Sequence, residues 1–179
     1  FDNSSSTFEV DEESIWLKKD GLLYQMTLST DLKRYVRIKT HKEITKRYSG
    51  FGGIQRINGK VYIQTKNHFF KYSKEQEQFF EDKTMSALFQ KIPIVNLVYE
   101  DQLGNIWYTY GQGLGMLQKK DNRYQNSAAP FSNLTGELVS DYLSINTIDQ
   151  KNIFIGLTNG LAHYNPEQAN RFVTIPKAY

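Results

Sequence analysis

Residues 101–118 have the sequence DQLGNIWYTYGQGLGMLQ, a polar turn followed by two apolar-rich strands that a second turn separates. Trp107 is the centre of the first of these strands, between an isoleucine and a tyrosine. Large aromatic residues in the same kind of setting recur at Trp16, Tyr62 and Phe154, so that the four positions are 46, 45 and 47 residues apart. A period of this size is typical of one four-stranded blade of a β-propeller and not of a helical hairpin repeat.

A second landmark has nearly the same place in every unit. The apolar residue that begins the third strand follows the aromatic residue by seven positions in three units and by six in the first unit. We therefore predict an all-β chain, a β-propeller fragment of about four four-stranded blades, within a larger ring of about seven. The predicted limits are a flexible lead-in over 1–7 and blades near 8–48, 49–92, 93–140 and 141–179. A β-sandwich is the alternative, but it does not require the same order of aromatic, glycine and leucine four times.

The composition points away from several classes of protein. The 179 residues include 22 basic and 19 acidic side chains, with a formal charge of +3, and the two signs are interspersed along the chain. Scattered charge is typical of a solvated surface, so we expect no nucleic-acid partner. The sequence has no cysteine, which excludes disulfides, and no run of about 18 apolar residues that would span a bilayer.

No pattern typical of catalysis or metal binding is present in the sequence. His41, His68 and His163 are far apart and lack the spacing of metal ligands. The glycine-rich stretch 111–115 precedes a strand and not a helix, which indicates a turn and not a dinucleotide-binding loop. The acidic residues lie mostly in turns, where Asp101 is expected to bind backbone N–H groups. We therefore expect no catalytic residue, no metal and no cofactor.

The segment 101–107, followed by Gly113 and Leu114, resembles the two-component-regulator propeller repeat, whose unit runs Asp-x-x-Gly-Asn-Ile-Trp and then Gly-Leu. Residues 152–161, NIFIGLTNGL, are similar to the same unit, with Phe154 in place of tryptophan. The other two units match more loosely. The Asp-box of sialidases has a related turn with glycine two residues after aspartate, whereas here the glycine comes three residues after it.

The resemblance implies a role in signalling. Proteins of that family are bacterial membrane sensors with an extracytoplasmic propeller region, a membrane helix and a histidine kinase, and many detect oligosaccharides. By this resemblance the chain is expected to be a periplasmic, non-catalytic ligand-sensing region, with the membrane and kinase segments outside the sequence. Its expected partners are a small-molecule or oligosaccharide ligand and further blades of the same chain or a second copy. A propeller scaffold for protein–protein contact and a carbohydrate-active enzyme are the alternatives.

The loops that join the second and third strands of each blade share one face of a propeller with the loops between blades. Ligands commonly enter at this face, and polar amides beside a tyrosine suit a sugar. The predicted ligand-binding residues are Lys19, Tyr48, Asn67, His68, Tyr110, Gln112, Asn133 and Asn159.

Overall fold

The computed structural model describes residues 7–11, 14–31, 33–47, 51–121, 123–127, 129–139, 143–168 and 173–175. The chain divides into two compact units, Phe1–Ile92 and Pro93–Tyr179. Each unit holds two antiparallel four-stranded sheets in which the strands pair in chain order.

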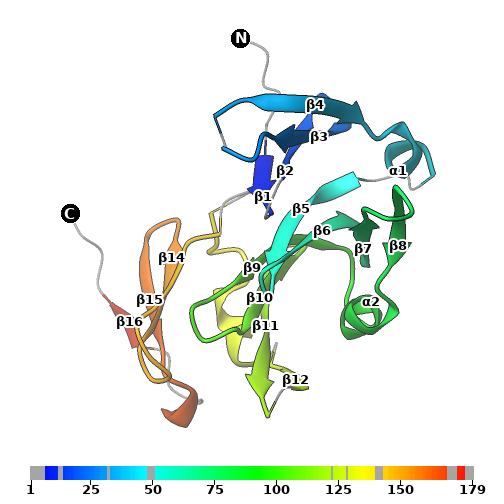
Figure 1. Ribbon diagram of the computed structural model, residues 1–179. Helices are drawn as coiled ribbons and strands as arrows, with labels where there is room; N and C mark the ends of the chain where they lie inside the picture. The colour runs from blue at the N-terminus through cyan, green and yellow to red at the C-terminus, as the bar shows by residue number, and fades with distance from the viewer. Residues whose placement is uncertain are drawn as a thin grey trace. The chain divides into compact units, whose positions relative to one another are not determined.

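The first unit contains the sheets β1–β4 and β5–β8 with two short helices (Figure 1). The elements are β1 (Thr7–Val10), β2 (Ser14–Lys19), β3 (Leu22–Leu28), β4 (Tyr35–Thr40), α1 (Lys42–Arg47), β5 (Phe51–Ile57), β6 (Lys60–Thr65), β7 (His68–Ser73), β8 (Gln78–Glu81) and α2 (Lys83–Phe89).

The second unit contains the sheets β9–β12 and β13–β16. Its elements are β9 (Val95–Glu100), β10 (Ile106–Tyr110), β11 (Gly113–Lys120), β12 (Arg123–Asn126), the 3-10 helix η1 (Ala129–Leu134), β13 (Ile145–Thr147), β14 (Ile153–Leu157), β15 (Gly160–Tyr164), the 3-10 helix η2 (Pro166–Gln168) and β16 (Val173–Ile175). Four consecutive antiparallel strands in one sheet form the blade of a propeller. The prediction of an all-β propeller fragment is confirmed, while the blade limits at 48, 92 and 140 stay a prediction.

Tight turns join the strands within each blade as the sequence indicates. Asn58 and Gly59 connect β5 to β6 with φ values of 49° and 70°. A two-residue hairpin of this type needs a positive φ at both positions, which asparagine and glycine tolerate best. The local chemistry of the turn therefore sets the register in which Ile57 pairs with Lys60.

The core of the first unit lies between its two sheets. Trp16 on β2 is 2% exposed and packs in one apolar cluster with Leu23, Ile54, Ile63 and Phe70 from both sheets. Alternation along each strand directs these side chains to one face. The aromatic residue of the first blade thus contacts the sheet that follows it in the chain.

The core of the second unit repeats this arrangement. Trp107 on β10 is fully buried in a cluster with Ile153 and Ile155 from β14, Tyr164 from β15 and Phe131 from η1. The Trp107 and Phe131 rings meet edge to face with centroids 5.2 Å apart. Such aromatic pairs add about 0.5–1.5 kcal/mol to the free energy gained by burying their surface.

Phe154 differs from the other three aromatic positions. Its side chain is only half-buried, and its ring is stacked on His163 with the ring centroids 4.9 Å apart. Its register is equivalent to that of Trp107, since each pairs with the residue nine positions later. The described part of the chain places no apolar cluster over its face, which explains the exposure.

The helices in the connections between sheets were not expected from the sequence. The α2 helix begins after Asp82, whose carboxylate accepts a hydrogen bond from the backbone N–H of Met85 at 3.1 Å. Met85 and Phe89 are buried four residues apart on one helix face. An N-cap aspartate before apolar residues four positions apart is a helix signal that is separate from the strand repeat. No helix in the described ranges is long and apolar enough to cross a membrane.

Candidate functional site

The predicted ligand-binding residues fall into both units. Lys19 ends β2, Asn67 lies in the turn before β7, and His68 begins β7. Tyr110 ends β10, and Gln112 lies in the turn after it. Asn133 lies in η1, and Asn159 directly precedes β15. Tyr48 lies outside the described residues. The proposal that these residues form one binding site stays a prediction.

In the first unit, two of the predicted residues make structural contacts. The Asn67 amide donates to the carbonyl oxygens of Phe89 at 3.0 Å and Ile92 at 2.7 Å, and so holds the end of α2. The exposed His68 ring is bound through Nδ1 to the Glu81 carboxylate at 2.6 Å. These contacts account for Asn67 and His68 without a ligand.

In the second unit, one segment links two of the predicted loops. The backbone N–H of Gly136 donates to the Gln112 carbonyl at 3.2 Å. The Thr158 N–H, next to Asn159, donates to the Glu137 carbonyl at 2.8 Å. The structure therefore brings the loops of Gln112 and Asn159 to the same segment, and both side chains are exposed.

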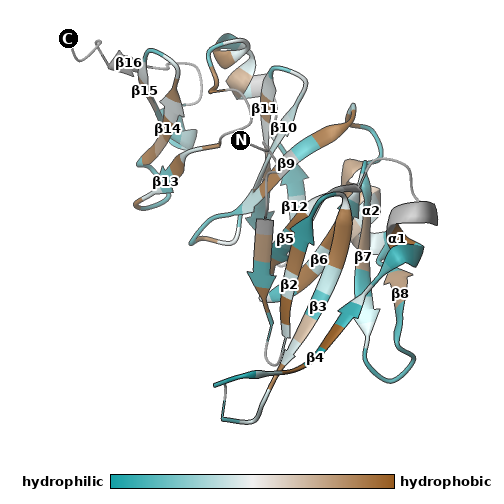
Figure 2. Ribbon diagram, turned by 90° about the horizontal axis from the view of Figure 1, so that it is seen from above, coloured by the Kyte–Doolittle hydropathy of each residue, from teal (hydrophilic) through white to brown (hydrophobic). Residues whose placement is uncertain are grey.

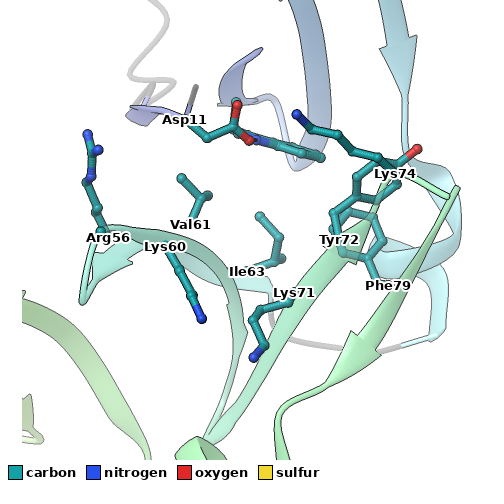
Figure 3. Close-up of a pocket in the computed structure, with 11 residues that line it drawn as sticks. Asp11, Arg56, Lys60, Val61, Ile63, Lys71, Tyr72, Lys74 and Phe79 are labelled. Carbon is teal, nitrogen blue, oxygen red and sulfur yellow. Dashed lines mark hydrogen bonds between the residues drawn. The ribbon is translucent and has the colours of Figure 1, made fainter. Parts of the chain in front are cut away.

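A cavity that the sequence did not predict lies between the two sheets of the first unit (Figure 3). Its volume is about 340 Å³, within the range of small-molecule sites. The residues that line it are Asp11, Trp16, Arg56, Gly59, Lys60, Val61, Ile63, Lys71, Tyr72, Lys74 and Phe79. It opens at the β1–β2, β5–β6 and β7–β8 turns, the opposite ends of the strands from the loops of Lys19 and Asn67.

Apolar side chains form one wall of the cavity. Tyr72 and Phe79 are half-buried and tilted against each other with ring centroids 5.2 Å apart. The Trp16 indole meets the edge of both rings, at 5.2 Å and 5.9 Å. Val61 and Ile63 from β6 complete this wall. The cavity can therefore cover an apolar face of a ligand.

The charged side chains of the cavity differ in where they point. Asp11 Oδ2 accepts the indole N–H of Trp16 at 2.8 Å, and its Oδ1 accepts the backbone N–H of Ser14 at 2.8 Å. In Figure 3 the ends of Arg56 and Lys74 lie on the same side as Asp11, at the top of the view. The β1–β2 turn thus holds the Asp11 carboxylate against the Trp16 indole, where it lines the cavity.

Two other cations lie away from this group. The amino groups of Lys60 and Lys71 point to the opposite side in Figure 3. Lys71 Nζ is paired with the Asp82 carboxylate at 2.8 Å and lies 5.7 Å from the centre of the Tyr62 ring. These two lysines contribute positive potential to the region, but their ends belong to the other face of the sheet.

A second carboxylate lies near Arg56. Glu9 on β1 is half-buried, and this burial raises the pKa of its carboxyl group, while the charge of Arg56 acts in the opposite direction. A shift from burial reflects the cost of keeping a charge away from water. Arg56 therefore lines the cavity and also offsets part of the negative charge of Glu9.

The sequence contained one signal for this cavity. Asp11 precedes Trp16 as Asp101 precedes Trp107, and both aspartates accept the indole N–H of the following tryptophan. Nothing in the strand pattern shows that a cavity lies beside Asp11. Among the described residues, no group of three or more histidine, aspartate or glutamate side chains could hold a metal ion.

No protein-family model matches the chain, and no curated protein matches it. The chain is similar in fold to solved extracellular domains from B. thetaiotaomicron. Two structures of the system BT4673, named as a one component and as a hybrid two component system, match with TM-scores of 0.54 and 0.57, at 17% and 18% identity. The hybrid two component system BT3049 matches with a TM-score of 0.50 at 17% identity.

These matches cover nearly all of this chain and a small part of each neighbour. They span 98%, 99% and 95% of the chain but 22% of each extracellular domain. The chain therefore has the fold of about one fifth of such a domain.

Proposed function

We propose that this chain is a non-catalytic, ligand-sensing propeller segment from the extracytoplasmic region of a membrane-bound two-component sensor. The observation that carries the proposal is the fold likeness along 99% of the chain to the extracellular domain of a hybrid two component system. In a Gram-negative bacterium this location is the periplasm. The histidine kinase and the membrane helix belong to other segments of the same protein.

The outer faces of the first and last sheets support a larger ring. On the first sheet, Phe8 is 66% exposed and pairs with Leu17, and Ile38 is 64% exposed and pairs with Met26. These positions share the face opposite to that of Trp16, and Figure 2 shows hydrophobic stretches along these strands. An exposed apolar sheet face is a site for association.

The last sheet exposes apolar residues on the face that carries its central aromatic residue. Ile148 is 64% exposed and Leu161 is 38% exposed, on the side of the sheet that carries the half-buried Phe154. The equivalent Trp107 packs against the sheet that follows it. We propose that further blades cover both outer faces, in a ring of about seven.

The proposed ligand is an oligosaccharide. The inter-sheet cavity supports this class because aromatic rings, a carboxylate and basic groups suit the apolar face and the hydroxyl groups of a sugar. Binding would signal by stabilising one packing arrangement of the blades more than another.

The contacts of Asp101, the most buried acid among the described residues, support a non-catalytic role. The Asp101 carboxylate is 5% exposed and accepts hydrogen bonds from the backbone N–H groups of Leu103 and Asn105, the Asn105 amide and the Trp107 indole. A carboxylate engaged in this way organises its own turn, which is a structural role.

The test is a panel of neutral and acidic oligosaccharides added to the 179-residue chain, with the melting temperature and the release of reducing sugar measured together. A rise in melting temperature with one sugar and no sugar release is the expected result. Release of reducing sugar would show an enzyme instead, and no shift with any sugar would favour a protein scaffold.

A further inference from the structure

The two inter-sheet interfaces differ at one position. In the second unit, Asp101 Oδ2 accepts both the Trp107 indole N–H at 2.9 Å and the Thr147 hydroxyl at 3.0 Å. Thr147 lies on β13 of the next sheet and is 3% exposed. The small hydroxyl therefore ties the aspartate of one blade directly to the following blade.

In the first unit the same aspartate and tryptophan are present, but the residue opposite them is different. Arg56 pairs with Val61, directly before Tyr62, as Thr147 pairs with Ile153, directly before Phe154. Arg56 thus has the register position of Thr147. Where the threonine closes the second interface, the first interface contains the cavity of about 340 Å³.

We infer that this cavity binds a carboxylated sugar unit of an acidic oligosaccharide, with the Arg56 guanidinium as the group that holds the carboxylate. The inference rests on the proposed function and adds the charge of the ligand and its place in the fold. The planar guanidinium matches a carboxylate through two parallel hydrogen bonds, which a lysine ammonium does not provide.

The other residues of the cavity suit the rest of such a sugar unit. Tyr72 and Phe79 offer half-buried ring surface for the C–H face. The Asp11 carboxylate lines the cavity and can accept from sugar hydroxyl groups, since a carboxylate offers about four acceptor sites. Lys74 adds a second cation on the same side (Figure 3).

The overall charge of the cavity favours an anion over a neutral ligand. Four of its lining side chains are basic and one is acidic. Lys71 is held by Asp82, and Glu9 offsets part of the charge of Arg56. The excess of basic side chains around the cavity would attract a ligand carboxylate.

The experiment compares acidic oligosaccharides with their methyl esters by isothermal titration calorimetry on the 179-residue chain. The probes are trimers of galacturonate and glucuronate, each beside its ester, and a panel of neutral oligosaccharides. The variants are Arg56→Gln and, as matched control, Arg34→Gln, which removes an exposed arginine of the β3–β4 loop. Arg56→Lys keeps the charge and serves as a second variant if Arg56→Gln does not fold.

We expect one of the acidic trimers to bind at least about 10-fold more tightly than its ester. Arg56→Gln should weaken this binding by about 10- to 100-fold, as expected for the loss of a charged hydrogen-bonded pair. Arg56→Lys should weaken the binding by a smaller factor than Arg56→Gln, because the positive charge remains. Arg34→Gln should leave the binding unchanged.

Two outcomes would overturn the inference in different ways. If acid and ester bind equally, or if only neutral sugars bind, and Arg56→Gln has no effect, this cavity is not an acidic-sugar site, while oligosaccharide sensing stands. If no sugar of either class binds, the proposed function fails together with the inference.

Discussion

The hydroxyl of Thr147 donates a hydrogen bond of 3.0 Å to the Asp101 carboxylate, although the two residues are 46 positions apart in the sequence. That separation is the length of one blade repeat, so the bond joins equivalent positions at the same strand ends of consecutive sheets. Because Asp101 also accepts the indole N–H of Trp107, a single buried carboxylate connects the turn, the core aromatic residue and the next blade.

Thr147→Val tests the value of this connection. Valine has nearly the same shape but no donor, so the buried carboxylate loses a partner, and we expect the free energy of unfolding in urea to fall by about 1.5–3 kcal/mol. Thr158→Val is the matched control, because the Thr158 hydroxyl is exposed and makes only a 3.4 Å contact. Equal losses from the two variants would show that the Asp101 bond has no special weight.

Gly115→Ala tests a close approach inside the third sheet. Gly115 pairs with Tyr108 across β10 and β11, and a Cβ at this position would overlap the Tyr108 ring. We expect a loss of about 1–3 kcal/mol in the free energy of unfolding, since Tyr108 is fully buried and an added methyl group would overpack the interior. If the clash is the cause, the double variant Gly115→Ala with Tyr108→Ala should lose less free energy of unfolding than the sum of the losses in the two single variants. A loss below about 0.5 kcal/mol would contradict this account.

Phe154→Ala should cost much less than Trp107→Ala, although the two aromatic residues occupy the same register position. Trp107 is fully buried, and removing such a ring costs about 3–5 kcal/mol. Phe154 is half-buried, so a loss of about 1 kcal/mol is expected, together with weaker binding of a hydrophobic dye to the last sheet. Equal costs in urea denaturation would mean that the face of Phe154 is covered in solution.

Protonation of His41 should destabilise the first unit below neutral pH. The ring is fully buried among Trp16, Tyr72 and Phe79, and burial lowers the pKa of His41 more than the hydrogen bond and charge of Glu43 raise it. The unfolded chain therefore takes up a proton at a higher pH than the folded chain. Stability should fall as the pH drops below about 6.5, by at most about 1.4 kcal/mol per pH unit.

The measurement is the urea stability of the chain and of His41→Gln between pH 7 and pH 5. This window lies above the ordinary pKa of glutamate, about 4.3, where Glu43 and Glu77 begin to lose their contribution. His41→Gln should remove the slope, and His68→Gln, at the surface, should keep it. Stability that rises on acidification would mean that Glu43 and Gln25, which face the two ring nitrogens, hold His41 in its charged form.

Much of the fold could be predicted because its signals are local and repeated. Alternation along the strands, the Asn58-Gly59 turn and the aromatic residues at positions 16, 62 and 107 each depend on neighbours in sequence. The helices α1 and α2 lie in the connections between sheets, and the repeat pattern of the strands does not predict the structure of those connections. Asp82 and the spacing of Met85 and Phe89 were the available signals.

The candidate site was less accessible to sequence reasoning. The expected loops of Asn67 and Gln112 lie at strand ends, as propeller geometry implies, but the cavity opens at the other ends of the strands, beside Asp11 and Arg56. Its existence depends on which side chain stands opposite the aspartate in the neighbouring sheet, and that pairing crosses about one repeat length.

The sequence by itself determined the four-stranded sheets and the positions of their central aromatic residues, because period-two alternation and tight turns act over a few residues. Only the tertiary structure decided which of these positions are covered. Trp107 is buried and Phe154 is half-exposed at the same register, since burial requires a second sheet against that face. The same reason separates Thr147, which closes one interface, from Arg56, which lines a cavity in the other.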